Sequence, residues 1–268
     1  MVVVKMGNVR IYLSRKPMKV KKLNFFILEH YIKKGMIIAS FDIGKLNFAF
    51  YVEEFDENQL RELEDVDRNE RYNVDGTCTA KFSALLEKVY LNGKKLLLCN
   101  YDLTEDTDKE KYYDKDICYN MNRVLETYRE YWDDVSYVLV EQQMAFGKKV
   151  NTMALKLGQN CQSYFMFNYG KDEIQIVEFP AYHKTQVLGA KKTESMTKRG
   201  KKTYKVMGDK ERKVWSVKEG YYLLALREDY ETMNEIQQMK KRDDVNDVIL
   251  QLQAYKYLTF VEKKKKEE

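Results

Sequence analysis

Two short apolar segments that carry an acid at their end constrain the fold of this chain more than any other feature. Met36–Asp42 (MIIASFD) ends in Asp42, and residues 136–142 (SYVLVEQ) carry Glu141 next to their end. Short apolar runs of this kind are typical of buried strands. A carboxylate beside a buried strand is costly unless it is paired, protonated or bound to a metal. Asp42 and Glu141 are therefore candidates for a functional site.

The remaining pattern alternates strands with amphipathic helices. The segment after Gly44 is predicted to form a hairpin with Met36–Asp42. In all, three further strands are predicted at residues 47–52, 94–103 and 174–179. Helical spacing of apolar residues predicts helices at residues 114–134, 148–169, 214–230 and 243–260. Residues 82–90 fit either a short helix or part of a charged insertion at about 56–80. This order predicts an α/β domain with a central sheet.

Length and composition indicate one substantial domain. The chain has 268 residues, of which 44% are hydrophobic and 33% charged, so it can bury a core. We place the domain at residues 36–260, followed by a charged tail at residues 261–268. Residues 1–35 are basic, with Glu29 as their sole acid. We interpret them as an organelle-targeting segment or as an over-long reading frame ahead of Met36.

Several classes of site are disfavoured by residue usage. The four cysteines are scattered and only two histidines occur, so we expect reduced thiols and no zinc site. No apolar run approaches the length of a membrane span, so we expect no membrane partner. No glycine-rich nucleotide-binding turn follows the acidic strand ends, and we expect no small-molecule cofactor.

Basic residues are concentrated at 184–218, where twelve lysines and arginines face three acids. Such a block suits a polyanion, because binding at phosphates releases condensed counterions. A solvated loop is the alternative for a bare charge run. The candidates for nucleic-acid contact are Lys184, Lys191, Lys192, Lys198, Arg199, Lys201, Lys202 and Lys213.

The last predicted helix begins with three acids, Asp243, Asp244 and Asp247. Its core stripe consists of Val245, Val248, Ile249 and Leu252. Asp244 and Asp247 lie together at the border of that stripe, whereas Asp243 points toward solvent and is predicted to cap the helix. Each acid alone is more often a turn or cap residue, but the joint pattern is more specific. Oxygen-only ligands favour magnesium or manganese.

Four segments together resemble the RuvC-like Holliday junction resolvases, in particular the branch of poxviruses, other large DNA viruses and yeast mitochondria. They are FDIG at 41–44, VEQQ at 140–143, FPAYHKTQVLG at 179–189 and KRDDVNDVILQ at 241–251. The resemblance covers about residues 36–260 and puts Lys184 at the lysine position of the family. Residues 1–35 have no counterpart, and the basic block is longer than expected. Lys213 is our choice for a second functional lysine.

The resemblance implies a ribonuclease H-like fold, with a central mixed five-stranded sheet flanked by helices, and a homodimer. It implies one four-carboxylate site per subunit, formed by Asp42, Glu141, Asp244 and Asp247, which binds two Mg²⁺ ions that Mn²⁺ can replace. Asp42 would bridge the ions, and Lys184 would offset charge on the phosphate or make an ordinary phosphate contact. The implied activity is paired nicking of branched DNA, the four-way junctions of recombination and repair. We expect a viral protein in the infected cell, with a mitochondrial protein as the alternative.

Three other functions stay open at this stage. An actin-like or sugar-kinase-like ATPase also opens with a strand that ends in Asp-x-Gly, but the glycine-rich turns of that fold are missing after VEQQ. An integrase-like, transposase-like or RNA–DNA hybrid nuclease would share the fold and the acids. A non-catalytic DNA-binding protein would use the basic block alone. The dimer interface is equally open, since the apolar stripe at 148–169 fits either core packing or a partner subunit.

Overall fold

The structure is a computed structural model that divides the chain into two compact units, Met1–Gly35 and Met36–Glu268. In the first unit it describes the backbone of residues 2–6 and 9–13, which form the antiparallel strands β1 (Val2–Met6) and β2 (Val9–Leu13). The sequence pattern did not predict these strands. The structure also describes Gly35 and, in the second unit, residues 36–105, 115–143, 150–170, 172–197 and 200–262.

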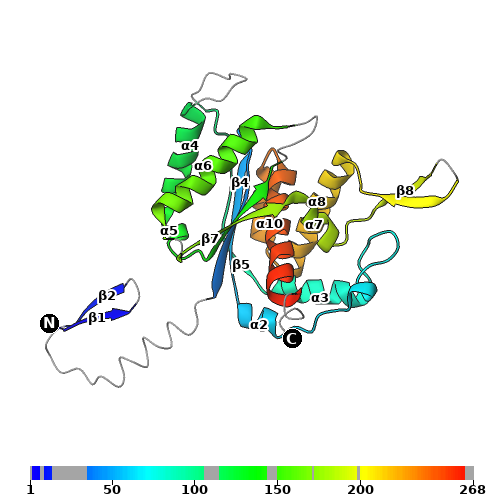
Figure 1. Ribbon diagram of the computed structural model, residues 1–268, viewed down its shortest axis with the longest axis horizontal. Helices are drawn as coiled ribbons and strands as arrows, with labels where there is room; N and C mark the ends of the chain where they lie inside the picture. Colours follow the sequence, from blue (N-terminus) through cyan, green and yellow to red (C-terminus); the bar gives the residue numbers. More distant parts are fainter. Residues whose placement is uncertain are drawn as a thin grey trace. The chain divides into compact units, whose positions relative to one another are not determined.

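A mixed five-stranded sheet forms the centre of the second unit (Figure 1). In sheet order its strands are β5 (Lys94–Tyr101), β4 (Phe48–Phe55), β3 (Met36–Asp42), β6 (Tyr137–Gln142) and β7 (Gln175–Pro180). β3, β4 and β5 are antiparallel neighbours, whereas β6 runs parallel to β3 and to β7. The predicted hairpin around Gly44 and the predicted fold class, a ribonuclease H-like α/β fold with a central mixed sheet, are confirmed.

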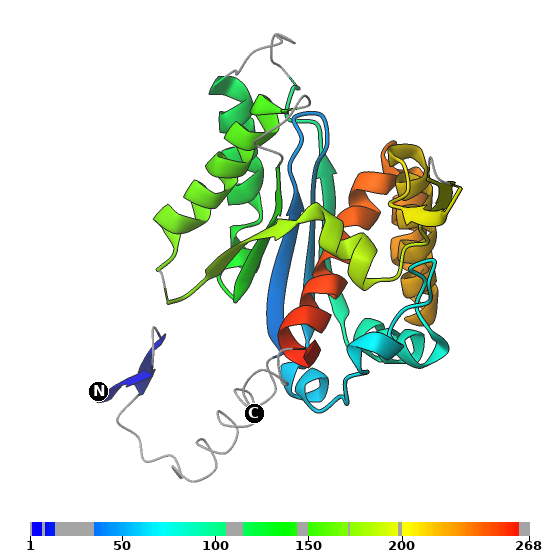
Figure 2. The ribbon, with the colours of Figure 1, turned by 45° about the vertical axis from the view of Figure 1, so that its right-hand side comes forward.

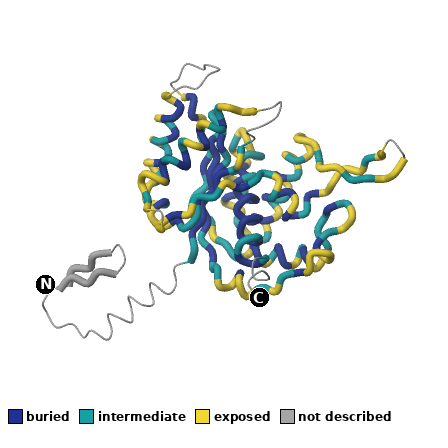
Figure 3. The backbone as a smooth tube through the Cα atoms, viewed as in Figure 1, coloured by how far each residue is buried: buried dark blue, intermediate teal, exposed yellow. Residues whose placement is uncertain are grey.

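Helices cover both faces of this sheet (Figure 2). On one face lie α4 (Lys115–Thr127), α5 (Arg129–Trp132) and α6 (Thr152–Asn168). On the other lie α3 (Ala80–Leu91), α8 (Asp209–Leu226) and α10 (Arg242–Lys256). The side chains of a strand alternate between these layers. Ile37 and Ala39 of β3 pack with the first layer and Ile38 with the second, which explains why the middle of this strand is buried on both faces (Figure 3).

The helix predicted at 114–134 is interrupted, which corrects the sequence interpretation. The carbonyl of Leu125 accepts hydrogen bonds from the backbone N–H of Tyr128 and from the indole of Trp132, at 3.2 and 2.6 Å. This tight turn ends α4 at Thr127 and starts α5. The insertion at 56–80 is not wholly irregular either, because it holds α2 (Glu57–Arg61) and a 3₁₀ turn.

The basic block is also more ordered than an irregular loop. It contains α7 (Ala181–Val187) and a hairpin of β8 (Thr193–Met196) and β9 (Lys202–Lys205), which projects from the body of the unit (Figure 1). The predicted helix at 214–230 begins earlier, at Asp209, and a separate helix α9 (Tyr230–Gln238) follows it. α10 continues into a π-helical turn at Tyr257–Val261.

A buried ionic network ties the sheet to the second helical layer. Glu53 of β4 is fully buried and pairs with Arg227 and with Lys256 of α10, each at 2.7 Å. Tyr51 and Gln253 donate further hydrogen bonds to the same carboxylate. Burial alone would raise the pKa of Glu53, but the two cations outweigh it and hold the pKa at about 2.

Replacement of Glu53 by glutamine is expected to lower the free energy of unfolding by roughly 3–5 kcal/mol at pH 7, because two buried cations lose their counter-ion. The folded-state pKa lies below the unfolded value of 4.5, so the stabilisation by Glu53 is present above pH 4.5 and is lost as the pH falls toward 2. Urea unfolding of wild type and Glu53→Gln should therefore show a difference that shrinks on acidification. A difference that does not change with pH would contradict this, and the exposed Glu231→Gln serves as control.

Candidate active site

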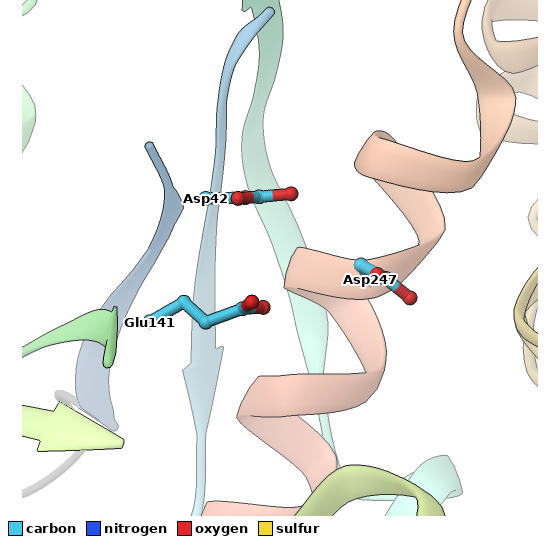
Figure 4. A group of neighbouring side chains, drawn as sticks. All are labelled: Asp42, Glu141 and Asp247. Carbon is cyan, nitrogen blue, oxygen red and sulfur yellow. The ribbon is translucent and has the colours of Figure 1, made fainter. Parts of the chain in front are cut away.

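The two strand acids meet at one edge of the sheet. Phe41 of β3 is paired in register with Val140 of the parallel strand β6, so the residues that follow them, Asp42 and Glu141, emerge side by side. Figure 4 shows both side chains extending from the strand ends toward α10. Carboxyl ends of adjacent parallel strands are where open α/β sheets place their ligand sites.

α10 brings a third acid to the same place. Gln251, which is buried, donates hydrogen bonds to Ser40 Oγ at 3.0 Å and to the Phe41 carbonyl at 3.4 Å. Asp247 lies one helical turn before Gln251 on the same face and therefore lies over the end of β3. Sequence reasoning did not single out Gln251 or Ser40, because their contact joins residues far apart in the chain.

Asp42, Glu141 and Asp247 form a cluster in which each contributes a carboxylate oxygen, and these oxygens lie within 4.8 Å of one another. Among the described residues, this is the group of acids, cysteines and histidines that is close enough to hold a metal ion. The donors are all carboxylate oxygens, which suits a hard cation such as Mg²⁺ or Mn²⁺. The predicted convergence of acids from three distant stretches is thus present in the fold.

Asp244, the fourth predicted ligand, lies outside this close group. It is one turn earlier on α10, half-buried, and its charge still acts on Asp42. Burial and the neighbouring Asp243 raise the pKa of Asp244 to about 6. The structure therefore brings three of the four predicted carboxylates together and leaves the fourth at the border.

Lys184 lies inside the carboxylate cluster. It is located in α7 and is 2% exposed, and its Nζ lies 2.9 Å from Glu141 Oε2 and 2.8 Å from Asp247 Oδ2. Burial alone would lower the pKa of Lys184, but Glu141, Asp247 and Asp42 outweigh it and raise the pKa above its ordinary value. The lysine is thus a permanently charged member of the site rather than a solvent-exposed residue.

Negative charge is crowded around Asp42. Burial raises the pKa of Asp42 well above its ordinary value, and Glu141 and Asp247 raise it further, with Lys184 opposing them. Like charges held this close in a low-dielectric region are unfavourable unless a cation compensates them. The donor set and its charge therefore fit a divalent metal ion.

Asp243 does not cap α10, which corrects the sequence interpretation. The helix begins at Arg242 with Lys241 at the cap position, so Asp243 lies within the first turn. Its carboxylate is paired with Lys213 of α8. Lys213, which we chose as the second functional lysine, therefore forms its ion pair with Asp243 and not with a carboxylate of the cluster.

α8 supports Asp247 from behind. The buried Ser216 donates a hydrogen bond to Asp247 Oδ1. One turn later, Gly220 lies against Asn246, and a Cβ at this position would overlap the Asn246 side chain. The missing side chain lets α8 and α10 approach closely enough for Ser216 to reach Asp247. Neither residue carried a signal in the sequence.

Gly220→Ala is expected to destabilise the protein by about 1–3 kcal/mol, because the added methyl group must push α8 away from α10. Gly158→Ala in α6 is a matched control, since a Cβ there meets no atom within 4 Å. The control should be neutral or slightly stabilising, as alanine is the better helix former. Equal unfolding midpoints for the two variants would contradict the close packing of α8 on α10.

The predicted nucleic-acid contacts are distributed over the hairpin and its base. Lys191, Lys192, Lys201 and Lys202 are exposed. Lys202 pairs with Glu194 across the hairpin at 2.7 Å, and Lys191 lies 3.9 Å from Asp75. Lys198 and Arg199 lie outside the described residues. None of the four described lysines contacts the carboxylate cluster, unlike Lys184.

The apolar residues of α6, which fitted either core packing or a partner subunit, fall into two groups. Met153 and Phe165 pack against the sheet in the core. Met166 and Phe167, in contrast, are 54% and 89% exposed. Core packing explains the first pair, and the second pair remains available to a partner.

Fold and site define a class: an α/β protein with a ribonuclease H-like sheet and a carboxylate cluster at its strand ends. The chain belongs to the family of uncharacterized protein 170L of Invertebrate iridescent virus 6, with which it shares 30% identity over 240 residues, 87% of this chain and 93% of that protein. Uncharacterized protein 97L of Invertebrate iridescent virus 3 is 26% identical over 82% of this chain and 98% of that protein. No protein-family model matches the chain.

Similar solved structures include three resolvases. Fowlpox virus resolvase with Holliday junction DNA is 16% identical (TM-score 0.45, 84% of this chain and 99% of that chain). Thermus thermophilus RuvC is 10% identical (0.43, 84% and 98%), and the yeast mitochondrial Holliday junction resolvase Ydc2 is 13% identical (0.43, 91% and 87%). Two of them, from fowlpox virus and yeast mitochondria, come from the branch that the sequence motifs resemble. At such scores the fold assignment rests on the strand order and directions described above.

Proposed function

We propose that this protein is a metal-dependent endonuclease that cuts branched DNA and resolves four-way junctions by paired nicks. The observation that carries the proposal is the convergence of Asp42, Glu141 and Asp247 around Lys184 at the carboxyl ends of two parallel strands. An all-carboxylate site with a buried lysine suits the hydrolysis of a phosphodiester better than the binding of a small organic cofactor.

The three clustered carboxylates would hold the metal, with Asp244 as a fourth ligand from the adjacent turn of α10. Mg²⁺ is the expected ion and Mn²⁺ an expected substitute, and the sequence resemblance implies two ions per site. When bound, such ions activate the attacking water and stabilise the leaving oxygen. Ser216 and Gln251 act as positioning residues, because Ser216 donates a hydrogen bond to Asp247 and Gln251 fastens α10, the helix that carries Asp247, to Ser40 of β3.

Lys184 would stabilise the scissile phosphate electrostatically. Its ammonium group is held among Glu141 and Asp247 and carries a full positive charge there. A fixed cation beside a phosphate stabilises the negative charge that develops on the non-bridging oxygens during in-line attack. When a metal ion binds to Glu141 and Asp247, the ammonium group would leave at least one of these partners and be free to face the phosphate.

Branched DNA is the proposed substrate, and the motifs FDIG, VEQQ, FPAYHKTQVLG and KRDDVNDVILQ support this choice over hybrids or linear duplex. The projecting hairpin would contact backbone phosphates through Lys191, Lys192, Lys201 and Lys202. Two symmetric nicks require two sites, so we propose a homodimer. The exposed Met166 and Phe167 of α6 are candidates for its interface.

We further propose that the protein acts in the virus-infected cell. The iridescent virus relatives support a viral origin. Among the described residues, no helix is long and apolar enough to cross a membrane. The role of residues 1–35 as a targeting segment stays a prediction, with the mitochondrion as the alternative location.

Asp42→Asn, Glu141→Gln and Asp247→Asn should each reduce Mg²⁺-dependent nicking of a four-way junction by about 100-fold or more, because each removes a metal ligand. Junction binding should persist in all three, since each variant removes negative charge near phosphate. The exposed Glu231→Gln is the control and should cleave like wild type. Full nicking by the three variants would eliminate the nuclease proposal and favour a protein that only binds DNA.

Substrate preference is tested with equal amounts of four-way junction, flap, RNA–DNA hybrid and linear duplex. We expect the junction to be cut fastest and in symmetric pairs, with ends that a ligase can seal. Preferential cutting of hybrids or single-strand transfer would assign the same carboxylates to a different nuclease. ATP hydrolysis without cleavage would instead favour the actin-like alternative.

A further inference from the structure

A second basic surface lies beside the carboxylate cluster, apart from the hairpin. α8, α9 and the start of α10 enclose an open groove of about 730 Å³. Its charged lining comprises Lys213, Lys240, Arg242 and Asp243. Lys240 and Arg242 are exposed, and Asp243 is paired with Lys213. The groove therefore carries a surplus of positive charge, to which the adjacent exposed Lys241 adds.

The amino terminus of α10 is an unfavourable position for these cations. Lys240, Lys241 and Arg242 are consecutive and occupy the end of one connection and the first turn of α10. The amino terminus of a helix is the positive end of its dipole, so basic side chains there are unfavourable. Arg242 also donates a hydrogen bond to the Gln237 carbonyl at the end of α9, whereas Lys240 and Lys241 are exposed at a position that favours an anion.

The groove adjoins the candidate active site along α8 and α10. Lys213 pairs with Asp243, which immediately precedes the predicted ligand Asp244. On the same face of α8, Ser216 follows Lys213 by one turn and donates to Asp247 of the cluster. A strand in the groove would therefore pass within one helical turn of residues that contact the cluster.

The remaining lining suits a nucleic-acid backbone better than a single small anion. Val214 is 71% exposed, and Val217 and Met239 also line the groove. Gln237 and Gln238 contribute amide groups. Sugars offer apolar surface and phosphates accept hydrogen bonds from amides and cations, which matches this mixture. The open shape suits an extended strand.

We propose that this groove binds the phosphodiester backbone of the DNA strand that is cut, on one side of the scissile phosphate. The inference rests on the proposed nuclease function, which it deepens by assigning a path to the strand. It adds Lys240 and Arg242 to the contacts, at a surface separate from the hairpin. The contacts are made to backbone, so they act equally on all sequences.

The test measures junction affinity as a function of salt concentration in the full chain with Asp42→Asn, which prevents cleavage. Adding Lys240→Ala and Arg242→Ala should weaken binding and make the slope of log K against log salt shallower by about 2, roughly one for each lost phosphate contact. Lys240→Ala with Lys241→Ala is a second variant that leaves Arg242 bonded to the Gln237 carbonyl. Its slope should also become shallower.

Lys88→Ala with Lys94→Ala is the matched control. It removes the same net charge from two exposed positions, Lys88 on α3 and Lys94 at the far end of the sheet, where Lys94 pairs with Glu54 in register. The control should leave the slope within about 0.5 of the parent. If both groove variants behave like this control while their unfolding midpoints stay unchanged, the groove does not bind DNA and the inference is wrong.

The outcome is separable from that of the proposed nuclease function. Cleavage is measured separately, with the groove substitutions made in a protein that keeps Asp42. If these variants cleave normally with Mg²⁺ and the salt slope is unchanged, the groove proposal is rejected and the nuclease proposal stands. A shallower slope in a protein that cuts no DNA would support the groove and reject the nuclease. If the groove instead binds an acidic protein, the groove variants should match the control in DNA affinity and in salt slope. That result would also overturn the proposal.

Discussion

Repulsion among three closely placed carboxylates is the constraint around which this protein is arranged. Asp42, Glu141 and Asp247 place oxygens within 4.8 Å of one another in a partly buried region. Lys184 offsets part of that repulsion through two ion pairs of 2.8–2.9 Å. One lysine cannot neutralise three acids, so the arrangement is unfavourable for folding and is best explained by a cationic ligand. The same residual charge is what would draw divalent ions to the site.

The elements around the cluster hold these charges together from several sides. Parallel pairing of β3 with β6 puts Asp42 beside Glu141, and α10 is fastened to β3 through Gln251. The contact of α8 with α10 at Gly220 supports Asp247 through Ser216. At the opposite end of α10, the buried Glu53–Lys256 pair ties the same helix to β4. α10 is thus anchored at both ends, which fixes the position of its acids relative to the strands.

The sequence pattern predicted much of this arrangement because buried strands and amphipathic helices leave periodic apolar residues. β3 was predicted with its observed bounds, and the acids at the strand ends were evident from their position alone. The hairpin β8–β9 was missed because TESM and KTYK carry charge without an apolar face. α7 was missed because it is only seven residues long. Ser216 and Gln251 could not be found, since their contacts depend on packing between distant segments. Helical periodicity placed Asp244 and Asp247 on one face of α10. It could not show that only Asp247 lies close to the two strand acids.

The most direct test of the central claim is anomalous diffraction from crystals of the protein soaked in Mn²⁺. The account predicts manganese peaks at about 2.1–2.2 Å from carboxylate oxygens of Asp42, Glu141 and Asp247, with the Lys184 ammonium moved away from at least one of its two partners. Crystals in which Lys184 keeps both ion pairs and no manganese lies among these three residues would contradict it.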